Sequence, residues 1–185
     1  MIENLKEIIR ELGNKSIFNP DCNSLSNQEW NEIIELFSYD YQRYYSDSLD
    51  IYKVKYFPGL LATFFYRIAR KLFLKGDEIN ALEFSSVGFS LTAIEIYFSA
   101  EIGKGLKINH GIGTVIGSRT ILGDNVLLHH AVTIGEKNGG RAKIGNNVII
   151  YPGSIIVGDI YIGENSIIGA NVFVDKSYPE KSKIY

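Results

Sequence analysis

An aliphatic side chain recurs at every sixth position through the second half of the chain. A glycine often follows this lead residue, and a small or β-branched residue often stands four positions after it. A period of six fits neither an amphipathic helix nor a simple alternating hairpin. The lead residues are Ile96, Ile102, Ile108, Ile116, Leu122, Leu128, Ile134, Ile144, Ile150, Ile156, Ile162, Ile168 and Val174.

The six-residue period predicts a parallel β-helix, in which short strands wind around a narrow prism. Each lead should point inward, three units should close one triangular coil of about 18 residues, and each strand should pair with the strand of the next coil. The thirteen leads then make a little over four coils. We expect a tight corner with positive φ at the glycines that follow the leads, namely Gly103, Gly117, Gly123, Gly135, Gly145, Gly163 and Gly169.

The period breaks twice, and each break predicts a loop that leaves the regular coil. The leads Ile108 and Ile116 stand eight positions apart, so two extra residues lie within 109–113. Ile134 and Ile144 stand ten positions apart, which puts four extra residues within 135–141. Loops on a rigid scaffold often carry function. Both breaks are therefore candidate parts of a functional site.

The first half of the chain has the period of amphipathic helices. Apolar residues line one face of 2–12, and Gly13 and the following asparagine should end that helix. Ser26 and Glu29 have the spacing of a capping box at the start of a second helix, which carries an aromatic stripe over 30–44. Such a stripe more often belongs to a core or an oligomer contact than to a cofactor site.

Two further helices complete the predicted helical region. One covers 60–75 and is closed by Gly76 at a C-cap position, and the next covers 77–89 and leads into the coils. The fold class is therefore α+β, with a helical domain over residues 1–91 followed by a β-helix of hexapeptide repeats over residues 92–185.

Composition narrows the classes of function. The net charge is −2, with 19 Lys and Arg interspersed among 21 Asp and Glu, so we expect no nucleic-acid partner. Cys22 is the only cysteine, which excludes an intramolecular disulfide and suits a reducing compartment. The first residues do not have the pattern of a secretory signal, and the apolar stretch 60–74 is too short and too basic for a transmembrane segment. We expect a cytoplasmic protein.

Several motifs resemble the serine acetyltransferase branch of the hexapeptide-repeat acyltransferases. A weaker similarity extends upstream through Phe57-Pro58-Gly59 and Tyr66-Arg67-Ile68-Ala69, so the resemblance covers roughly residue 47 to the end. The motifs that carry it are Thr92-Ala93-Ile94-Glu95-Ile96, Ala100-Glu101-Ile102-Gly103-Lys104-Gly105-Leu106, Asn109-His110-Gly111-Ile112-Gly113, Val132-Thr133-Ile134-Gly135 and Ile168-Gly169-Ala170.

The resemblance implies a left-handed β-helix, a homotrimer with active sites between neighbouring subunits, and acetyl transfer from acetyl-CoA to a hydroxyl. A hydroxyl is a poor nucleophile near neutral pH, so a base must take its proton, and histidine has the pKa suited to that work. His110 matches the family's catalytic histidine. Glu95, fifteen positions earlier, matches the carboxylate that orients the imidazole.

Departures from the family pattern concern the acceptor. The family generally has Asp before the catalytic histidine and Arg-His-Pro in the later loop, whereas this chain has Asn109 and Arg141-Ala142-Lys143. A family glutamate is replaced by Ser118, and Asp47 aligns only loosely with an acidic residue of the helical domain. Asn109, Arg141 and Asp47 are the candidate acceptor contacts. L-serine is the simplest acceptor, and a sugar hydroxyl of a capsule or surface polysaccharide is the alternative.

Acetyl-CoA is expected in the groove between coils near the second break. Lys137 and Lys143 are candidate phosphate contacts, while Gly135, Gly153 and Ala170 are small residues that would let the ligand approach. A zinc site is disfavoured because His129 and His130 are adjacent and should point to opposite faces. A non-enzymatic or ice-binding scaffold would favour regular rows of Thr, which this sequence lacks.

Overall fold

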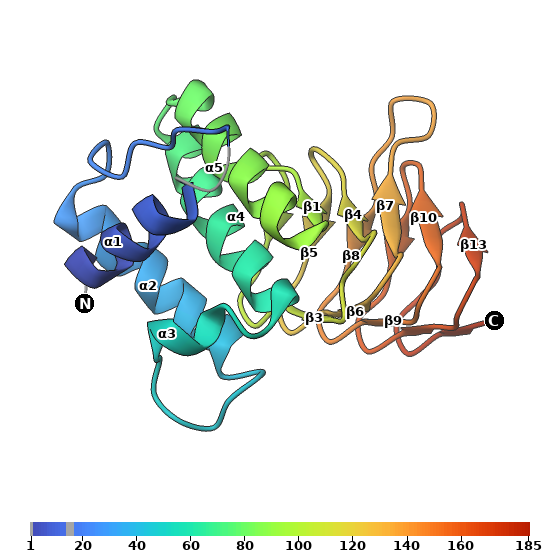
Figure 1. Ribbon diagram of the computed structural model, residues 1–185. Helices are drawn as coiled ribbons and strands as arrows, with labels where there is room; N and C mark the ends of the chain where they lie inside the picture. The colour runs from blue at the N-terminus through green and yellow to red at the C-terminus, as the bar shows by residue number, and fades with distance from the viewer. Residues whose placement is uncertain (1, 14–16) are drawn as a thin grey trace.

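The computed structural model describes residues 2–13 and 17–185, and it places a group of helices at one end of a long parallel β-helix (Figure 1). The chain runs from the helices into the coil and ends at the far end of the coil. The helices are α1 (Ile2–Gly13), α2 (Asn27–Tyr41), α3 (Ile51–Val54), α4 (Pro58–Leu74) and α5 (Glu78–Thr92).

Three parallel sheets form the sides of the β-helix. Sheet A contains β1 (Glu95–Ile96), β4 (Val115–Ile116), β7 (Thr133–Gly135), β10 (Ile155–Val157) and β13 (Phe173–Val174). Sheet B contains β2 (Glu101–Ile102), β5 (Ile121–Leu122), β8 (Lys143–Ile144) and β11 (Tyr161–Ile162). Sheet C contains β3 (Lys107–Asn109), β6 (Leu127–His129), β9 (Ile149–Ile150), β12 (Ile167–Ile168) and β14 (Lys183–Ile184).

The strand register confirms the hexapeptide interpretation. Every predicted lead is buried, and the leads pair with one another from coil to coil, as Ile116 does with Ile134. The predicted fold class, helices followed by a left-handed parallel β-helix, is confirmed. The last strand, β14, was not predicted, because Ile184 stands ten positions after Val174 and so leaves the period of six.

The expectation of positive φ at the glycines after the leads is wrong. None of them is among the residues with positive φ, which instead include Gly105 and Asn125 two positions further along. These glycines serve a different purpose, since a Cβ on Gly103 would lie 2.3 Å from an Asp124 carboxylate oxygen of the next coil. Stacked coils approach as closely at Gly123, Gly145, Gly163 and Gly169, whereas a Cβ on Gly135 would make only ordinary contacts. The left-handed corners fall mostly on Gly and Asn.

The helical predictions agree with the structure except at some boundaries. The capping box at the start of α2 is present, with Glu29 N–H donating to the Ser26 side chain and Ser26 N–H donating to Glu29. Gly76, with φ +87, follows the C-terminus of α4 as expected. Helix α5 extends three residues beyond the predicted end, and α2 stops at Tyr41 rather than Tyr44. The short helix α3 was not predicted.

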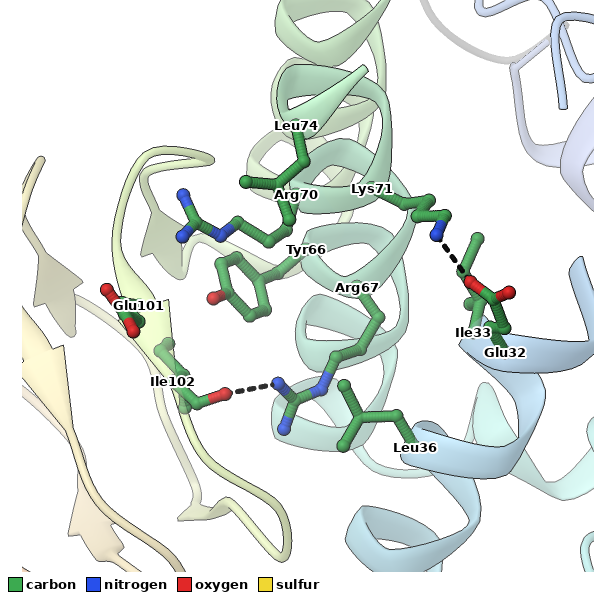
Figure 2. A pocket seen from close by; sticks show the side chains of 10 residues that line it. All are labelled: Glu32, Ile33, Leu36, Tyr66, Arg67, Arg70, Lys71, Leu74, Glu101 and Ile102. Atoms are coloured by element: carbon green, nitrogen blue, oxygen red, sulfur yellow. Dashed lines mark hydrogen bonds and ion pairs between the residues drawn. The ribbon is translucent and has the colours of Figure 1, made fainter. Parts of the chain in front are cut away.

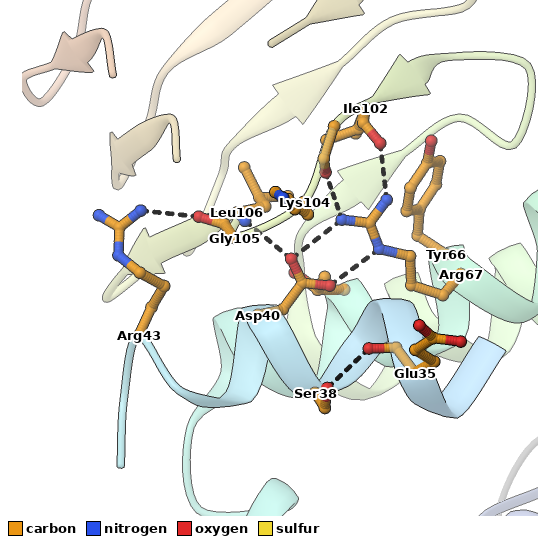
Figure 3. Close-up of polar contacts among 12 residues, drawn as sticks. Glu35, Ser38, Asp40, Arg43, Tyr66, Arg67, Ile102, Lys104, Gly105 and Leu106 are labelled. Atoms are coloured by element: carbon orange, nitrogen blue, oxygen red, sulfur yellow. Dashed lines mark hydrogen bonds and ion pairs between the residues drawn. The ribbon is translucent and has the colours of Figure 1, made fainter. Parts of the chain in front are cut away.

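A buried ion pair joins the helices to the first coil (Figure 3). Arg67 of α4 binds both carboxylate oxygens of Asp40 of α2, at 2.8 and 2.9 Å. The same guanidinium donates to the carbonyls of Ile102 and Gly103, while Asp40 accepts from the N–H of Leu106. Both side chains are almost fully buried. We call this network the Asp40–Arg67 clasp; it satisfies backbone groups of the corner between sheets B and C.

A close backbone contact fixes the start of α4 against β3. A Cβ on Gly59 would lie 2.2 Å from the carbonyl oxygen of Ile108, so only glycine fits there. The Tyr44 hydroxyl accepts from the N–H of Ile108 and donates to its carbonyl. The N-terminal turn of α4 and the segment after α2 therefore meet the coil at the strand that leads into the first predicted loop.

Candidate functional site

His110 stands at the corner between β3 and β4, where the first break in the repeat occurs. Asn109 pairs with His129 and Val115 pairs with Thr133, so the two extra residues lie in this corner, as predicted. His110 has φ 59 and is exposed. A Cβ on Gly111 would lie 2.2 Å from the Ile94 side chain, so the glycine lets the loop fold tightly onto the coil and present the imidazole outward.

A cavity of about 390 Å³ opens beside His110, between the helices and β3. Its lining combines aromatic residues and the start of α4 with the outward side chains of β3. The lining residues are Tyr44, Tyr56, Phe57, Pro58, Gly59, Lys107, Ile108, Asn109 and His110. We call this the His110 cavity. Two sequence-predicted residues, Asn109 and His110, are brought together here.

Glu95 lies on β1, just after the same corner but outside the His110 cavity. It lines a separate cavity with Ser85, Ser86 and Phe89 of α5. The two segments touch, because Gly113 N–H donates to the Ala93 carbonyl. In the described part of the chain, no hydrogen bond joins the Glu95 carboxylate to His110, so their pairing as a dyad stays a prediction.

The other two histidines belong to the next coil at the same corner. The His129 ring stacks on Tyr151, with ring centroids 5.1 Å apart and planes at 12°. Burial lowers the pKa of His129, and the charges of His130 and His110 lower it further. His130 is exposed in the turn. Over residues 2–13 and 17–185, no group of three or more His, Cys, Asp or Glu has the arrangement to hold a metal ion.

The second predicted loop lies at a different corner, between sheets A and B. It contains an antiparallel bridge between Lys137 and Gly140. Arg141 donates to the Ser118 carbonyl at 2.7 Å and pairs with Glu136 at 3.2 Å. The Lys137 ammonium pairs with Asp175 at 2.7 Å. In a single chain, these cations are therefore engaged locally and lie across sheet A from His110.

The remaining predicted contacts are divided between the two edges of sheet A. Gly153 and Ala170 fall at the corner between sheets C and A, in the same stack of corners as His110; the Gly153 N–H donates to the His130 carbonyl. Gly135 ends β7 and Lys143 begins β8, so both belong to the edge that carries Arg141.

Asp47 lies in the connection between α2 and α3, and its carboxylate is engaged locally. It pairs with the Lys53 ammonium and accepts from the Tyr41 hydroxyl at 3.1 Å. The hydrogen bond from Lys53 lowers the pKa of Asp47. It does not line the His110 cavity, so the structure does not bring Asp47 to the candidate base.

A second cavity, of about 350 Å³, lies between α2, α4 and β2 (Figure 2). Its cations are engaged: Arg67 donates to the Ile102 carbonyl, and Lys71 pairs with Glu32. Arg70 donates to the Ser99 carbonyl at 3.4 Å. It contains no histidine. The His110 cavity is the better candidate site because it combines a titratable base with open space.

Sequence reasoning missed the other residues that line the His110 cavity. Tyr44, Tyr56 and Phe57 come from the connections between helices, whose position on the coil no repeat predicts. Lys107 carried a usable signal, because it immediately precedes a lead residue and so had to face outward, next to the first break.

Known proteins of one family are similar to this chain. The family model for the bacterial transferase hexapeptide (six repeats) matches residues 141–176. A serine acetyltransferase from Staphylococcus aureus (strain Mu50) is 39% identical over 132 residues, which cover 69% of this chain and 62% of that protein. A serine acetyltransferase from Helicobacter pylori (strain 26695) is 37% identical over 130 residues, which cover 68% of this chain and 76% of that protein.

Solved structures of serine acetyltransferases share the fold. Isoform 3 from Entamoeba histolytica, solved in complex with cysteine, has a TM-score of 0.79 and 27% identity, covering 85% of this chain and 59% of that one. The Neisseria gonorrhoeae enzyme in complex with serine has a TM-score of 0.75 and 31% identity. The match covers 83% of this chain and 66% of that one.

This chain spans only 62% of the length of the S. aureus relative. Among the described residues, no helix is both long and apolar enough to cross a membrane. The match to the H. pylori enzyme covers 76% of that protein at 37% identity, which is enough to assign this chain to a family. The chain belongs to the serine acetyltransferase family.

Proposed function

We propose that the protein transfers the acetyl group of acetyl-CoA to the hydroxyl of L-serine, with His110 as general base. The observation that carries the proposal is the position of His110, in a corner with a two-residue insertion and among the residues that line a cavity. Family membership supports the reaction class, since relatives named serine acetyltransferase share this part of the chain.

The chemistry needs few protein groups because a thioester is already activated. The imidazole of His110 takes the proton of the acceptor hydroxyl while the oxygen attacks the thioester carbonyl. The C–S bond then breaks, the ester forms, and the thiolate of CoA leaves and takes up the proton. Glu95 is proposed to orient the imidazole from the neighbouring segment, which would require its side chain to turn towards the corner.

A homotrimer is part of the proposal, with acetyl-CoA bound between neighbouring subunits. His110 and Arg141 lie at opposite edges of sheet A, so a site that uses both needs a second copy. Apolar side chains also face outward from the coil: Tyr151 is 41% exposed, Ile155 40% and Phe173 59%. Exposed apolar groups of this size favour a subunit contact. Sedimentation equilibrium should give three times the mass of the chain.

The proposed acetyl-CoA contacts are Lys137, Lys143, Gly135, Gly153 and Ala170, with Arg141 and Asn109 as acceptor contacts. The lysines would neutralise the phosphates of CoA, and the small residues would leave room beside the coil. We also propose that the protein acts in the cytoplasm, where acetyl-CoA is available; the buried free thiol of Cys22 is consistent with a reducing compartment.

The test is release of free CoA thiol from acetyl-CoA in the presence of L-serine, homoserine or a sugar. We expect release with L-serine and a loss of at least about 100-fold in kcat for His110→Ala. Glu95→Gln should reduce kcat less. Release with sugars alone would instead favour modification of a surface polysaccharide.

His130→Ala is the matched control, because it removes an exposed histidine from the equivalent corner of the next coil. It should keep kcat within about twofold of the unmodified protein. Full activity in His110→Ala, or an equal loss in both variants, would show that His110 is not the base.

A further inference from the structure

We infer that Lys107 recognises the carboxylate of the acceptor, and that the His110 cavity selects small hydroxy acids with little regard for an amino group. This inference rests on the proposed function, because it concerns the acceptor of the same reaction. It goes beyond that function by naming a specificity residue and a class of alternative substrates.

Lys107 stands on the same strand as the candidate site. Ile108 is buried, so Lys107 and Asn109 on either side of it share the outer face of β3, about 7 Å apart along the strand. His110 follows in the turn, and all three residues line one cavity. An acceptor whose hydroxyl lies at the imidazole can therefore extend its other groups along β3 towards the ammonium.

The charges around the cavity favour an anion. Among the described residues of one chain, Lys107 is the only Lys or Arg that lines the cavity, and no Asp or Glu lines it. Lys107 takes part in none of the ion pairs recorded for the described residues. Arg141, the other candidate acceptor contact, is bound by Ser118 and Glu136 at the far edge of sheet A in its own chain, so it would reach this cavity only from a second copy.

Tyr44 holds the lysine near the position where it is needed. The Lys107 ammonium lies 5.1 Å from the centroid of the Tyr44 ring, within the range of a cation–π contact. The ring itself is fixed, since its hydroxyl both donates to and accepts from the backbone of Ile108. A cation held in place in this way loses less conformational entropy when it binds a carboxylate.

The residues that line the cavity also predict weak recognition of an amino group. A primary ammonium is best bound by a carboxylate, and the residue beside His110 is the neutral Asn109. Removal of the amino group from L-serine gives 3-hydroxypropanoate, which keeps the hydroxyl and the carboxylate. Conversion of the carboxylate to an amide gives L-serinamide, which keeps the hydroxyl and the amino group.

The experiment compares these three acceptors in the unmodified protein and in Lys107→Gln. The unmodified protein should use 3-hydroxypropanoate with a kcat/KM within about tenfold of that for L-serine. Lys107→Gln should lower kcat/KM for both carboxylates by about 10- to 100-fold, mainly through KM, because a charge-assisted hydrogen bond is lost. Activity with L-serinamide should change by less than twofold, and Lys107→Arg should restore most of the loss.

Lys104→Gln is the matched control for overall charge. Lys104 is exposed, lies three residues earlier over the ring of Tyr39, and does not line the His110 cavity. It should leave kcat/KM for L-serine unchanged within twofold. An equal effect of Lys107→Gln on L-serine and L-serinamide, or no effect on either, would overturn the inference.

A binding measurement separates this inference from the proposed function. Calorimetric titration of 3-hydroxypropanoate should show binding to the unmodified protein and binding at least tenfold weaker to Lys107→Gln, whether or not acetyl transfer occurs. Absence of turnover with every acceptor would contradict the proposed function alone. Absence of binding to the unmodified protein, or equal binding to both proteins, would contradict carboxylate recognition by Lys107.

Discussion

The helical region and the β-helix are stabilised in different ways. The core of the coil is a column of aliphatic side chains, one from each strand, that repeats the same contact from coil to coil. The helical core instead contains large aromatic residues, such as Trp30, Phe37 and Phe65, each in surroundings of its own. Because the repeat of the coil is regular, the insertion at His110 can be recognised as an exception to it. The helical region has no such repeat, so its part of the candidate site could not be located in the same way.

The two regions meet through a few polar contacts. Neither the six-residue repeat of the coil nor the amphipathic period of the helices predicts them. The Asp40–Arg67 clasp joins α2, α4 and the corner between sheets B and C (Figure 3). Tyr44 and Gly59 fix the next corner, at β3. The coil repeats one pattern of contacts from strand to strand, whereas the junction depends on individual side chains. The following predictions test this contrast.

The largest expected effect is at the clasp. Arg67→Met would leave the carboxylate of Asp40 buried without its cation, which should lower the free energy of unfolding by about 3–5 kcal/mol. Urea denaturation followed by circular dichroism measures the change. The control is Lys71→Met on the same helix, which removes a more exposed pair with Glu32 and should cost only a small fraction of that loss.

The double variant Asp40→Leu with Arg67→Met sharpens this test, since it leaves no unpaired charge. It should recover part of the stability lost in Arg67→Met. A loss in the double variant as large as the sum of both single variants would mean that the clasp acts through packing rather than through charge.

A smaller effect is expected where the backbones approach. Gly59→Ala places a Cβ 2.2 Å from the Ile108 carbonyl, so the start of α4 must move and stability should fall by about 1–3 kcal/mol. Thermal unfolding checks this. Gly135→Ala is the control within the coil, because its nearest neighbour would lie 3.6 Å away, an ordinary contact. Equal losses in both variants would show that the loss at Gly59 does not come from its close contact with Ile108.

The smallest expected effect is on pH dependence. Burial lowers the pKa of His129 below its usual value of 6.5. The imidazole of His129 therefore binds a proton more readily in the unfolded chain than in the folded chain. Stability from this group is present above pH 6.5 and decreases as the pH falls through that value. His129→Gln should reduce the drop in melting temperature between pH 7 and pH 5, whereas the exposed His130→Gln should change it less.

Much of the coil could be predicted from the sequence, because its geometry repeats. The thirteen predicted leads are buried, and the insertion between Ile108 and Ile116 lies in a corner, as expected. The capping box at Ser26 was also readable, since it depends on residues three apart. The role of most glycines after the leads could not be predicted. A side chain is excluded there by atoms of the next coil and not by a positive φ of the glycine itself.

The candidate site was only partly predictable. His110 and Asn109 were found from the break in the repeat and from the family motif, and they share one cavity. Arg141 and Asp47 were expected beside them, yet each is engaged elsewhere in the single chain, by Glu136 and Lys53. Spacing along a sequence reports which corner a residue occupies, but it does not report the charged neighbour that the folded chain supplies.

The sequence alone determined the inward-facing residues of the coil, the position of the first loop and the family, because each depends on a short period or a local motif. Tertiary structure alone decided which residues of the helical region line the cavity beside that loop. Tyr44, Phe57 and Gly59 line the cavity beside β3 although they stand more than 45 positions away, and Tyr44 binds the backbone of Ile108. Such contacts follow from how two different cores pack together, which no local pattern encodes.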